Sequence, residues 1–261
     1  MADYPQGEHP MREWGLPHEG ELDRIVVVSP HLDDAVLGTG RLLARHPGAT
    51  VITVFAGTPP AYPDPMREWD VQSGFGPGDD VMAARLDEDR AAMEVLDATP
   101  VWLDFVEYSY RPGNKPVSPK EIVGDLADAI AALEPTVVLA PFGLANPDHD
   151  TTHRACMLAR EDARLATSAW WCYEDTGYKH IPGMLAWRVS KLFTSTLWPT
   201  PIAAPIDPIS DRKDKAVQCY PSQLRALEED WHLSVKLAAP APEQYWKLAP
   251  PPPGWEGLVD T

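Results

Sequence analysis

Five short runs of apolar residues, rich in β-branched side chains, recur along the first two thirds of the chain. Each run is five or six residues long, and such a continuous run is typical of a strand covered on both faces of a parallel sheet. We therefore expect strands at 25–29, 50–55, 101–106, 136–140 and 168–173.

Segments with helical spacing separate these runs. In one of them Met82, Leu86, Met93 and Leu96 recur at intervals of three to seven residues, which predicts a helix over 81–96. Strands that alternate with helices of about ten residues or more indicate parallel βαβ units with right-handed crossovers. The predicted fold class is α/β: a Rossmann-like, mostly parallel twisted sheet flanked by helices. The other helices are expected at 35–46, 122–133 and 151–163.

The pattern weakens after residue 187, where we expect a small antiparallel extension with strands at 188–197 and 202–206. Helices at 209–219 and 222–236 would follow. We predict three regions along the chain: an N-terminal arm over 1–23, one α/β catalytic domain over 24–236, and a Pro/Trp-rich C-terminal arm over 237–261.

Charge and composition narrow the classes of partner. With 22 basic and 39 acidic residues among 261, the chain has a net charge of −17, which repels nucleic-acid phosphates and anionic bilayers. The three cysteines are too few for a disulfide framework, and no apolar run reaches the roughly 18–20 residues of a membrane span. We expect a soluble cytoplasmic protein with no nucleic-acid or membrane partner; whether it forms a homo-oligomer stays open.

Two polar segments directly follow the first and fourth predicted strands. Residues 29–34 read Ser-Pro-His-Leu-Asp-Asp, and residues 146–149 read Asn-Pro-Asp-His. In a doubly wound sheet with the common strand order 3-2-1-4-5, strands 1 and 4 are neighbours where the order reverses, and ligands bind beyond their carboxyl ends. The two segments should therefore face each other across one crevice.

Facing each other, these segments offer three nitrogen or oxygen ligands in His31, Asp34 and His149. A catalytic zinc has three such ligands and an open position for water, so we expect one Zn²⁺ per chain. Asp33 would be the general base, and Asp148 would hold an imidazole by its distal N–H. Taken alone, a His-x-Asp-Asp sequence is more often a helix N-cap, and both interpretations can hold together.

These residues resemble a known family, the PIG-L/LmbE-like zinc-dependent de-N-acetylases. Residues 29–34 are similar to its His-Pro-Asp-Asp signature, and residues 146–149 to its His-Pro-Asp-His motif. Further landmarks follow in the family's order: Arg85-x-x-Glu88, Tyr173-Glu174-Asp175 with Tyr178, and the segment 215–223. The resemblance spans about residues 24–225.

The resemblance implies a hydrolase that removes an acetyl or acyl group from an amino sugar or a glycosylated metabolite. By this likeness His31, Asp34 and His149 fall at the metal positions and Asp33 at the base. A tailoring step in bacterial secondary metabolism fits the variations in the first motif. Two alternatives stay open: a catalytically impaired metal-binding domain of the same fold, and a zinc hydrolase of an ester or thioester bond.

Three residues depart from the family pattern. Leu32 replaces a proline, Ala35 replaces a common glutamate, and Asn146 stands where the family has a histidine thought to steady the oxyanion. An asparagine amide also donates to an oxyanion, and loss of one such donor typically costs about 10²–10³-fold in rate. His153, one helical turn beyond His149, is a candidate substitute that would bind substrate, or else an exposed helix histidine.

The candidate substrate contacts outside the two motifs lie in and after a long connection over 57–80. A connection of this length inside a compact domain is usually functional or disordered. Its aromatic residue Trp69, together with Tyr62 and Phe75, is a candidate for the rim of the substrate site. Arg85 would bind a substrate hydroxyl or carboxylate, or would pair with an acidic neighbour on its own helix. A dinucleotide fingerprint at Gly38 is rejected, because its third glycine is absent and it starts nine residues after the strand.

Overall fold

The structure is a computed structural model that describes residues 15–195, 197–206, 211–238 and 243–251. Its centre is a seven-stranded sheet with the order β3-β2-β1-β4-β5-β7-β6. The first five strands are parallel, and β7 runs antiparallel to both of its neighbours. The predicted fold class and the order of the five parallel strands are confirmed. The strands are β1 Ile25–Ser29, β2 Thr50–Thr53, β3 Thr99–Trp102, β4 Val137–Pro141, β5 Ala169–Tyr173, β6 Trp198–Ile202 and β7 Tyr245–Ala249.

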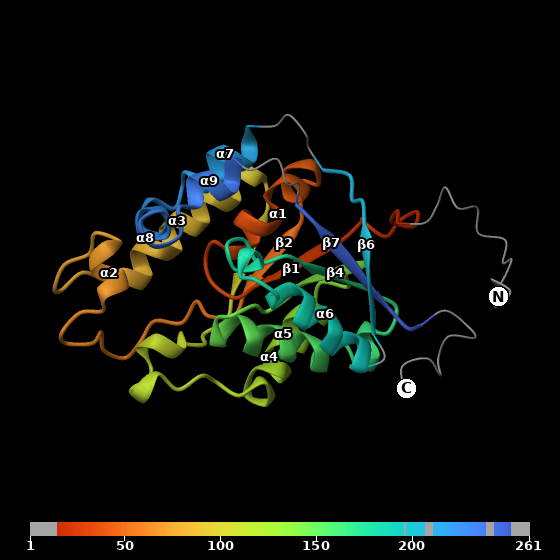
Figure 1. Ribbon diagram of the computed structural model, residues 1–261, viewed down its shortest axis with the longest axis horizontal. Helices are drawn as coiled ribbons and strands as arrows, with labels where there is room; N and C mark the ends of the chain where they lie inside the picture. Colours follow the sequence, from red (N-terminus) through yellow and green to blue (C-terminus); the bar gives the residue numbers. More distant parts are fainter. Residues whose placement is uncertain (1–14, 196, 207–210, 239–242, 252–261) are drawn as a thin grey trace, which may run out of the picture.

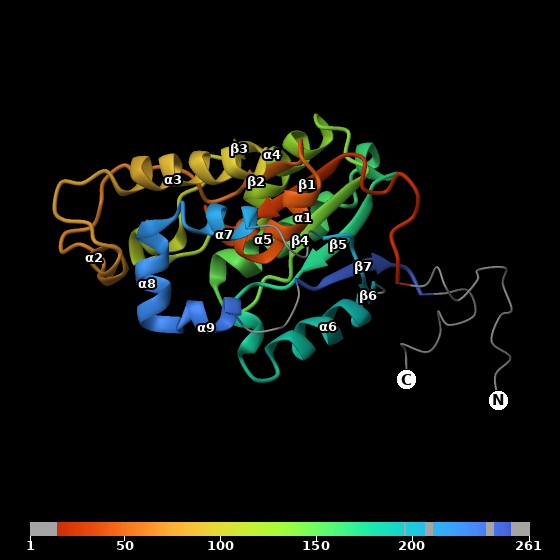
Figure 2. The same ribbon diagram turned by 90° about the horizontal axis from the view of Figure 1, so that it is seen from above.

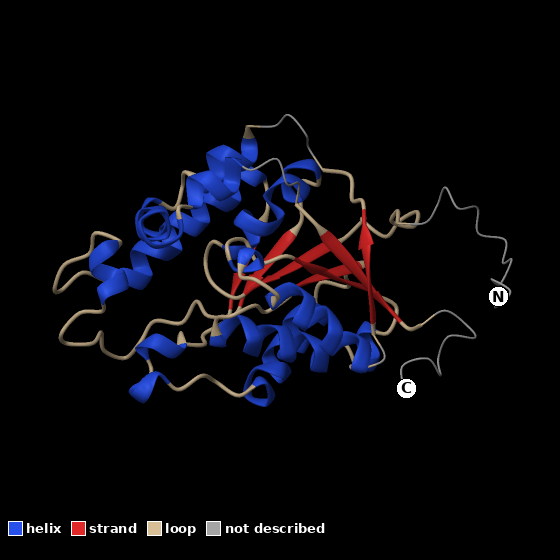
Figure 3. Ribbon diagram, in the orientation of Figure 1, coloured by secondary structure: helices blue, strands red, loops and turns tan. Residues whose placement is uncertain are grey.

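Helices cover both faces of the sheet and bury two separate apolar layers (Figures 1 and 3). Helices α1, α3 and α7 pack on one face, and α4, α5 and α6 on the other. Helices α2 and α8 contact each other and project together beyond one end of the sheet (Figure 2). The helices are α1 Asp34–Arg45, α2 Glu68–Gln72, α3 Val81–Leu96, α4 Pro119–Ala131, α5 Pro147–Ala159, α6 Met184–Thr194, α7 Arg212–Val217, α8 Pro221–Trp231 and α9 Leu233–Ala238.

The prediction of a strand over 188–197 is wrong, because residues 184–194 form the helix α6. Leu185, Val189 and Leu192 lie at helical spacing and pack against the core formed with α4 and α5. The apolar residues of 184–194 therefore recur at the helical period of about 3.6 residues and not at the two-residue alternation of a half-buried strand. Trp187 lies on the other side of this helix and is 48% exposed.

Strand β3 spans Thr99–Trp102, two residues earlier than the predicted start of 101–106, and further differences lie near the C-terminus. The predicted helix over 222–236 is interrupted at His232, whose φ of +49° ends α8 before α9 begins. Of the predicted strand at 202–206, only Ile202 belongs to a strand, as the last residue of β6. The predicted helix over 209–219 is realised as α7 from Arg212, while residues 207–210 lie outside the described residues.

Part of the predicted C-terminal arm belongs to the sheet. Strand β7 lies between β5 and β6, and its Trp246 donates a hydrogen bond to Glu174 at 3.1 Å. Residues 1–14 and 252–261 lie outside the described residues, so the division into arms and domain stays a prediction. Among the described residues, no helix has the length and apolar character needed to cross a membrane.

Two local features fix the chain where strands turn into helices. Ser29 Oγ accepts a hydrogen bond from Ala35 N at 3.0 Å and donates one to His31 O at 2.6 Å, so the last residue of β1 caps the first turn of α1. After β4, Gly143 has a φ of +73°, and a Cβ there would lie 2.5 Å from the side chain of His153. Only glycine fits this turn, which leads into α5.

Candidate active site

The two polar segments meet at one edge of the sheet, because β1 and β4 are adjacent parallel strands. Val27 lies opposite Leu139 in this pairing, so both strands end at the same level. Helix α5 begins one turn earlier than predicted, since Asn146 caps it and Pro147 occupies its first position. The second motif therefore lies in the first turn of α5 and faces the first turn of α1.

Three ligand atoms converge between these turns. His31 Nδ1 lies 3.3 Å from Asp34 Oδ2, and His149 Nε2 lies 3.2 Å from the same oxygen. One ligand atom from each of the three side chains lies within 4.8 Å of the other two. The structure thus brings together the three residues that the sequence predicts as metal ligands.

A carboxylate supports each histidine from behind. His31 Nε2 lies 3.1 Å from Asp148 Oδ2, and His149 Nδ1 lies 2.5 Å from Asp175 Oδ1. Because a carboxylate accepts the ring proton, each histidine is left with its other nitrogen free to face Asp34. Asp148 lies where the sequence places it, while Asp175 is a second supporting carboxylate to which the sequence analysis gave no role.

The electrostatics of this cluster favour a cation. Burial alone would lower the pKa of His149, but the carboxylates of Asp34 and Asp175 raise it to about 9. Burial would likewise lower the pKa of His31, and Asp148 and Asp34 raise it well above its ordinary value. A group of N and O donors that attracts positive charge so strongly, with an orienting carboxylate behind each imidazole, fits a divalent metal such as zinc.

Asp33 lies beside the three ligand atoms without belonging to them. It is the N-cap residue of α1, yet its side chain makes no capping hydrogen bond, because Ser29 serves that helix end. Burial and the neighbouring Asp34 carboxylate raise the pKa of Asp33 to about 8. A carboxyl group with a pKa near neutrality is suited to accept a proton and to release it again.

A cavity of about 340 Å³ opens over these residues. Asp33, Asp34 and both histidines form part of its wall, together with Asn146 from the second motif. The Asn146 Oδ1 accepts a hydrogen bond from Asp148 N at 2.8 Å, and its Nδ2 lies 3.5 Å from Tyr178 Oη. The amide oxygen is thus engaged by the helix cap, and the amide nitrogen donates to Tyr178, which also lines the cavity.

The three other predicted substrate contacts differ in whether they line the cavity. Trp69 lines the cavity. Arg85 lines it too, but it is only 1% exposed and forms ion pairs with Asp70 at 3.1 Å and Glu107 at 3.6 Å, not with acidic residues of its own helix. His153 is buried, lies outside the cavity wall, and has its Nδ1 2.9 Å from Pro141 O. The alternative of an exposed helix histidine is therefore wrong, and His153 is not among the described residues that line the cavity.

Several residues of the cavity wall were not predicted from the sequence. Glu107 enters from the connection after β3, Tyr178 from the loop after β5, and Trp231 from the end of α8. Tyr178 packs edge-on against His149, with ring centroids 5.0 Å apart, and against Trp231 at the same distance. A signal existed for Asp175 and Tyr178, which lie in the stretch that resembles the family, whereas Glu107 and Trp231 lie in segments without a motif.

Fold and site together define an α/β protein with a candidate metal centre at the point where strand order reverses. A sequence profile of the PIG-L family, described as GlcNAc-PI de-N-acetylase, matches residues 26–160, which is about half of the chain. The chain belongs to this family. Family membership supports a hydrolase that acts on an amide bond, a de-N-acetylase.

Solved structures agree with this assignment. The deacetylase Dbv21 of the A40926 pseudoaglycone is 29% identical, with a TM-score of 0.70 over 87% of this chain and 97% of that one. A deacetylase triple mutant from the teicoplanin biosynthetic pathway is 25% identical, with a TM-score of 0.69 over 87% and 98%. The N,N'-diacetylchitobiose deacetylase from Pyrococcus horikoshii, at 16% identity and a TM-score of 0.55 over 96% and 95%, shares the fold. No curated protein matches the sequence.

Proposed function

We propose that the protein hydrolyses the N-acyl amide of an amino-sugar unit on a glycosylated small molecule, with one zinc ion held by His31, Asp34 and His149. The observation that carries this proposal is the convergence of those three ligands and the free carboxyl group of Asp33 in one cavity. When bound there, a divalent ion supplies Lewis acidity, which lowers the pKa of water and polarises a carbonyl oxygen.

Asp33 is the proposed proton carrier. Its carboxylate takes a proton from the attacking water while a C–O bond forms at the amide carbon. It then gives that proton to the nitrogen as the C–N bond breaks, so the products are a carboxylic acid and a free amine. Burial and the charge of Asp34 raise the pKa of Asp33 to about 8, close to the neutral range in which one group can both accept and release a proton.

Two neutral donors are positioned to stabilise the negative charge that develops on the carbonyl oxygen. Asn146 Nδ2 and Tyr178 Oη lie 3.5 Å apart, and both residues line the cavity. Burial and the charge of Asp34 raise the pKa of Tyr178, so its phenol keeps the proton that it would donate. We propose that this pair takes the place of the histidine that the family has at position 146.

The proposed substrate class follows from the cavity and from the relatives. Trp69, Tyr178 and Trp231 present aromatic rings to the cavity, and such rings suit the apolar faces of a sugar or an aglycone. Two similar structures are deacetylases of the A40926 pseudoaglycone and of the teicoplanin pathway. We propose a related tailoring step on a glycosylated secondary metabolite.

A substrate panel tests this function. Purified protein is loaded with zinc and incubated with N-acetyl glycosides, N-acyl glycosides of longer chain, and matched acyl esters, and free amine and free acid are measured. We expect amine release from the amides, abolished by chelation and restored by zinc. Turnover of the esters alone would replace the proposal by an ester hydrolase, and no turnover with metal bound would favour a catalytically impaired domain.

A further inference from the structure

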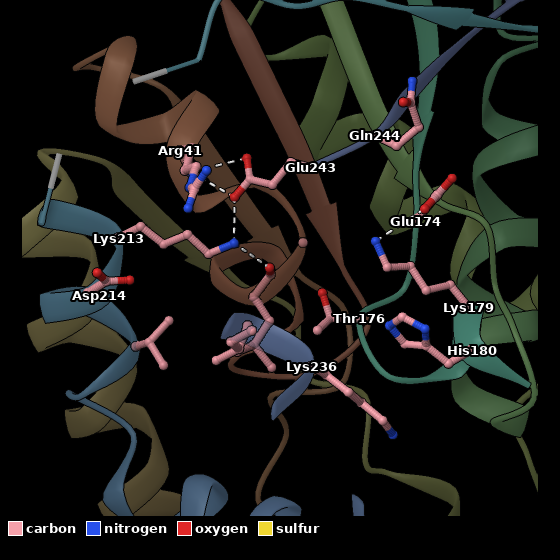
Figure 4. Close-up of a pocket in the computed structure, with 14 residues that line it drawn as sticks. Arg41, Glu174, Thr176, Lys179, His180, Lys213, Asp214, Lys236, Glu243 and Gln244 are labelled. Atoms are coloured by element: carbon pink, nitrogen blue, oxygen red, sulfur yellow. Dashed lines mark hydrogen bonds and ion pairs between the residues drawn. The ribbon is translucent and has the colours of Figure 1, made fainter. Parts of the chain in front are cut away.

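A second, smaller cavity lies beside the proposed active site, and we call it the side pocket (Figure 4). Its volume is about 60 Å³, compared with about 340 Å³ for the main cavity. Leu37 of α1 and Thr176 of the loop after β5 line both cavities. The two cavities are therefore neighbours that share a wall.

Charged side chains from five segments surround the side pocket. Arg41 and Lys213 stand on one side, with Lys179 and His180 opposite and Lys236 below them (Figure 4). The described residues of the lining include four lysine or arginine side chains and three acidic ones, Glu174, Asp214 and Glu243. This small excess of positive charge lies in a chain whose net charge is −17.

Two of these cations are already neutralised. Lys213 Nζ lies 2.5 Å from Glu243 Oε1, and the same carboxylate accepts a hydrogen bond from the Tyr245 hydroxyl at 2.6 Å. Lys179 Nζ lies 3.2 Å from Glu174 Oε2. These pairs hold the walls of the pocket together and leave their charges balanced.

The other two cations of the lining, Arg41 and Lys236, are not neutralised in this way. Among the described residues, neither side chain forms an ion pair, although both line the side pocket. The Lys236 ammonium lies 4.9 Å from the ring centroid of Trp231, which is itself part of the main cavity wall. The Glu243 carboxylate accepts hydrogen bonds from the main-chain amide of Arg41 at 2.9 and 3.1 Å, and Asp214, the third acid of the lining, is exposed to solvent. The pocket thus presents two cationic side chains that form no ion pair among the described residues.

We propose that the side pocket binds an anionic group of the substrate, a carboxylate or a phosphate, while the N-acyl group lies in the main cavity. The volume accommodates several water molecules, which is enough for one such group. The guanidinium of Arg41 provides paired donors that match the oxygens of a carboxylate or phosphate. This inference rests on the proposed function and adds a charge to its substrate.

Binding measurements on matched ligands test the proposal separately from turnover. N-acetylglucosamine glycosides that carry a terminal carboxylate on alkyl linkers of increasing length are compared with the uncharged primary amides of the same length. Binding is measured by calorimetry with the full-length, zinc-loaded protein. We expect the acid to bind about tenfold more tightly than its amide at one linker length, because a hydrogen bond to a charged group is worth about that factor.

Variants assign that preference to the pocket. Arg41→Gln and Lys236→Gln should each reduce the ratio of acid to amide affinity toward one, and Arg41→Lys should retain part of it. Arg45→Gln is the matched control, since Arg45 lies one turn further along α1, is exposed, and lies outside the pocket lining. Circular dichroism of each variant checks that α1 and α9 remain folded.

An equal affinity for acid and amide at every linker length overturns the proposal. Inorganic phosphate is titrated in parallel: if it binds to the wild type and not to Arg41→Gln while the acids show no preference, the pocket takes a free anion and the assignment to the substrate fails. Amine release from the uncharged glycosides is measured on the same samples. Absence of amine release from the wild type would refute the proposed function, whereas amine release without a preference for acids would refute only this inference.

Discussion

Replacing Asp175 by asparagine removes one charge from behind a proposed metal ligand and keeps the shape of the side chain. Asp175 is buried, with Oδ1 2.5 Å from His149 Nδ1, and its Oδ2 accepts a hydrogen bond from Gly143 N at 3.0 Å. An asparagine retains an oxygen for the Gly143 amide but presents a neutral group to the imidazole. The fold of the turn before α5 should therefore persist while the basicity of His149 decreases.

The magnitude follows from the bond that is lost. A hydrogen bond to a charged group contributes roughly 1.5–3 kcal/mol, and removal of a partner behind a metal-bound histidine typically costs about 10–100-fold in metal affinity. We expect the dissociation constant for zinc to rise by about 10–100-fold in Asp175→Asn. With saturating zinc, kcat should decrease less than metal affinity, because the three ligands and Asp33 remain.

Competition between the protein and a chromophoric chelator measures zinc affinity directly. Asp148→Asn is the matched variant for His31 and should show a loss of the same order, whereas Asp162→Asn, at a distant surface pair with Arg164, should show none. An affinity of Asp175→Asn within twofold of the wild type, in a folded protein, would refute the assignment of Asp175 as a support for a metal ligand.

Three further predictions concern other parts of the molecule. Asp33→Asn should retain zinc and lose about 10²–10⁴-fold in kcat, whereas His31→Ala should lose the metal; zinc content and kcat measured together check both. Arg85→Met should lower the free energy of unfolding by about 3–5 kcal/mol, measured by denaturant titration, because Asp70 and Glu107 would be left without their buried cation. Burial and the charge of Arg188 lower the pKa of His153 to about 4, so its neutral form stabilises the fold above pH 6.5 and this contribution, about 3 kcal/mol, is lost as the pH falls toward 4. The difference in unfolding free energy between wild type and His153→Gln should decrease accordingly over this range, and a difference independent of pH would contradict the reasoning.

The sequence predicted most of the parallel part of the fold because β1, β2, β4 and β5 are almost fully buried, whereas the edge strand β3 is only partly buried. Runs such as 25–29 and 136–140 are apolar throughout, so they identify strands, and the alternation with helices fixes their order. The contact between His31 and Asp148, which are 117 residues apart in the sequence, follows from that strand order. For the same reason His31, Asp34 and His149 could be predicted from the sequence as one cluster, and the structure brings them together.

Other features depend on contacts that no local pattern encodes. Helix α6 contains Arg188, which is buried because it donates to Gly143 O at 2.7 Å, and a buried charge obscured the apolar face of the helix. Asp175 acquires its role only when β5 is placed next to β4. The side pocket combines residues from α1, α7, α9 and two loops, so its charge balance is a property of the tertiary structure.

The capping of α1 by Ser29 has a consequence for how the first motif can vary. In most helices that begin with acidic residues, one carboxylate secures the first turn, and its replacement weakens the helix. Here a hydroxyl group at the end of β1 performs that task with two hydrogen bonds. The hydrogen bond that caps α1 and the proposed proton transfer therefore depend on two different side chains, Ser29 and Asp33. A substitution at Asp33 should change the reactivity of the site and leave this cap intact.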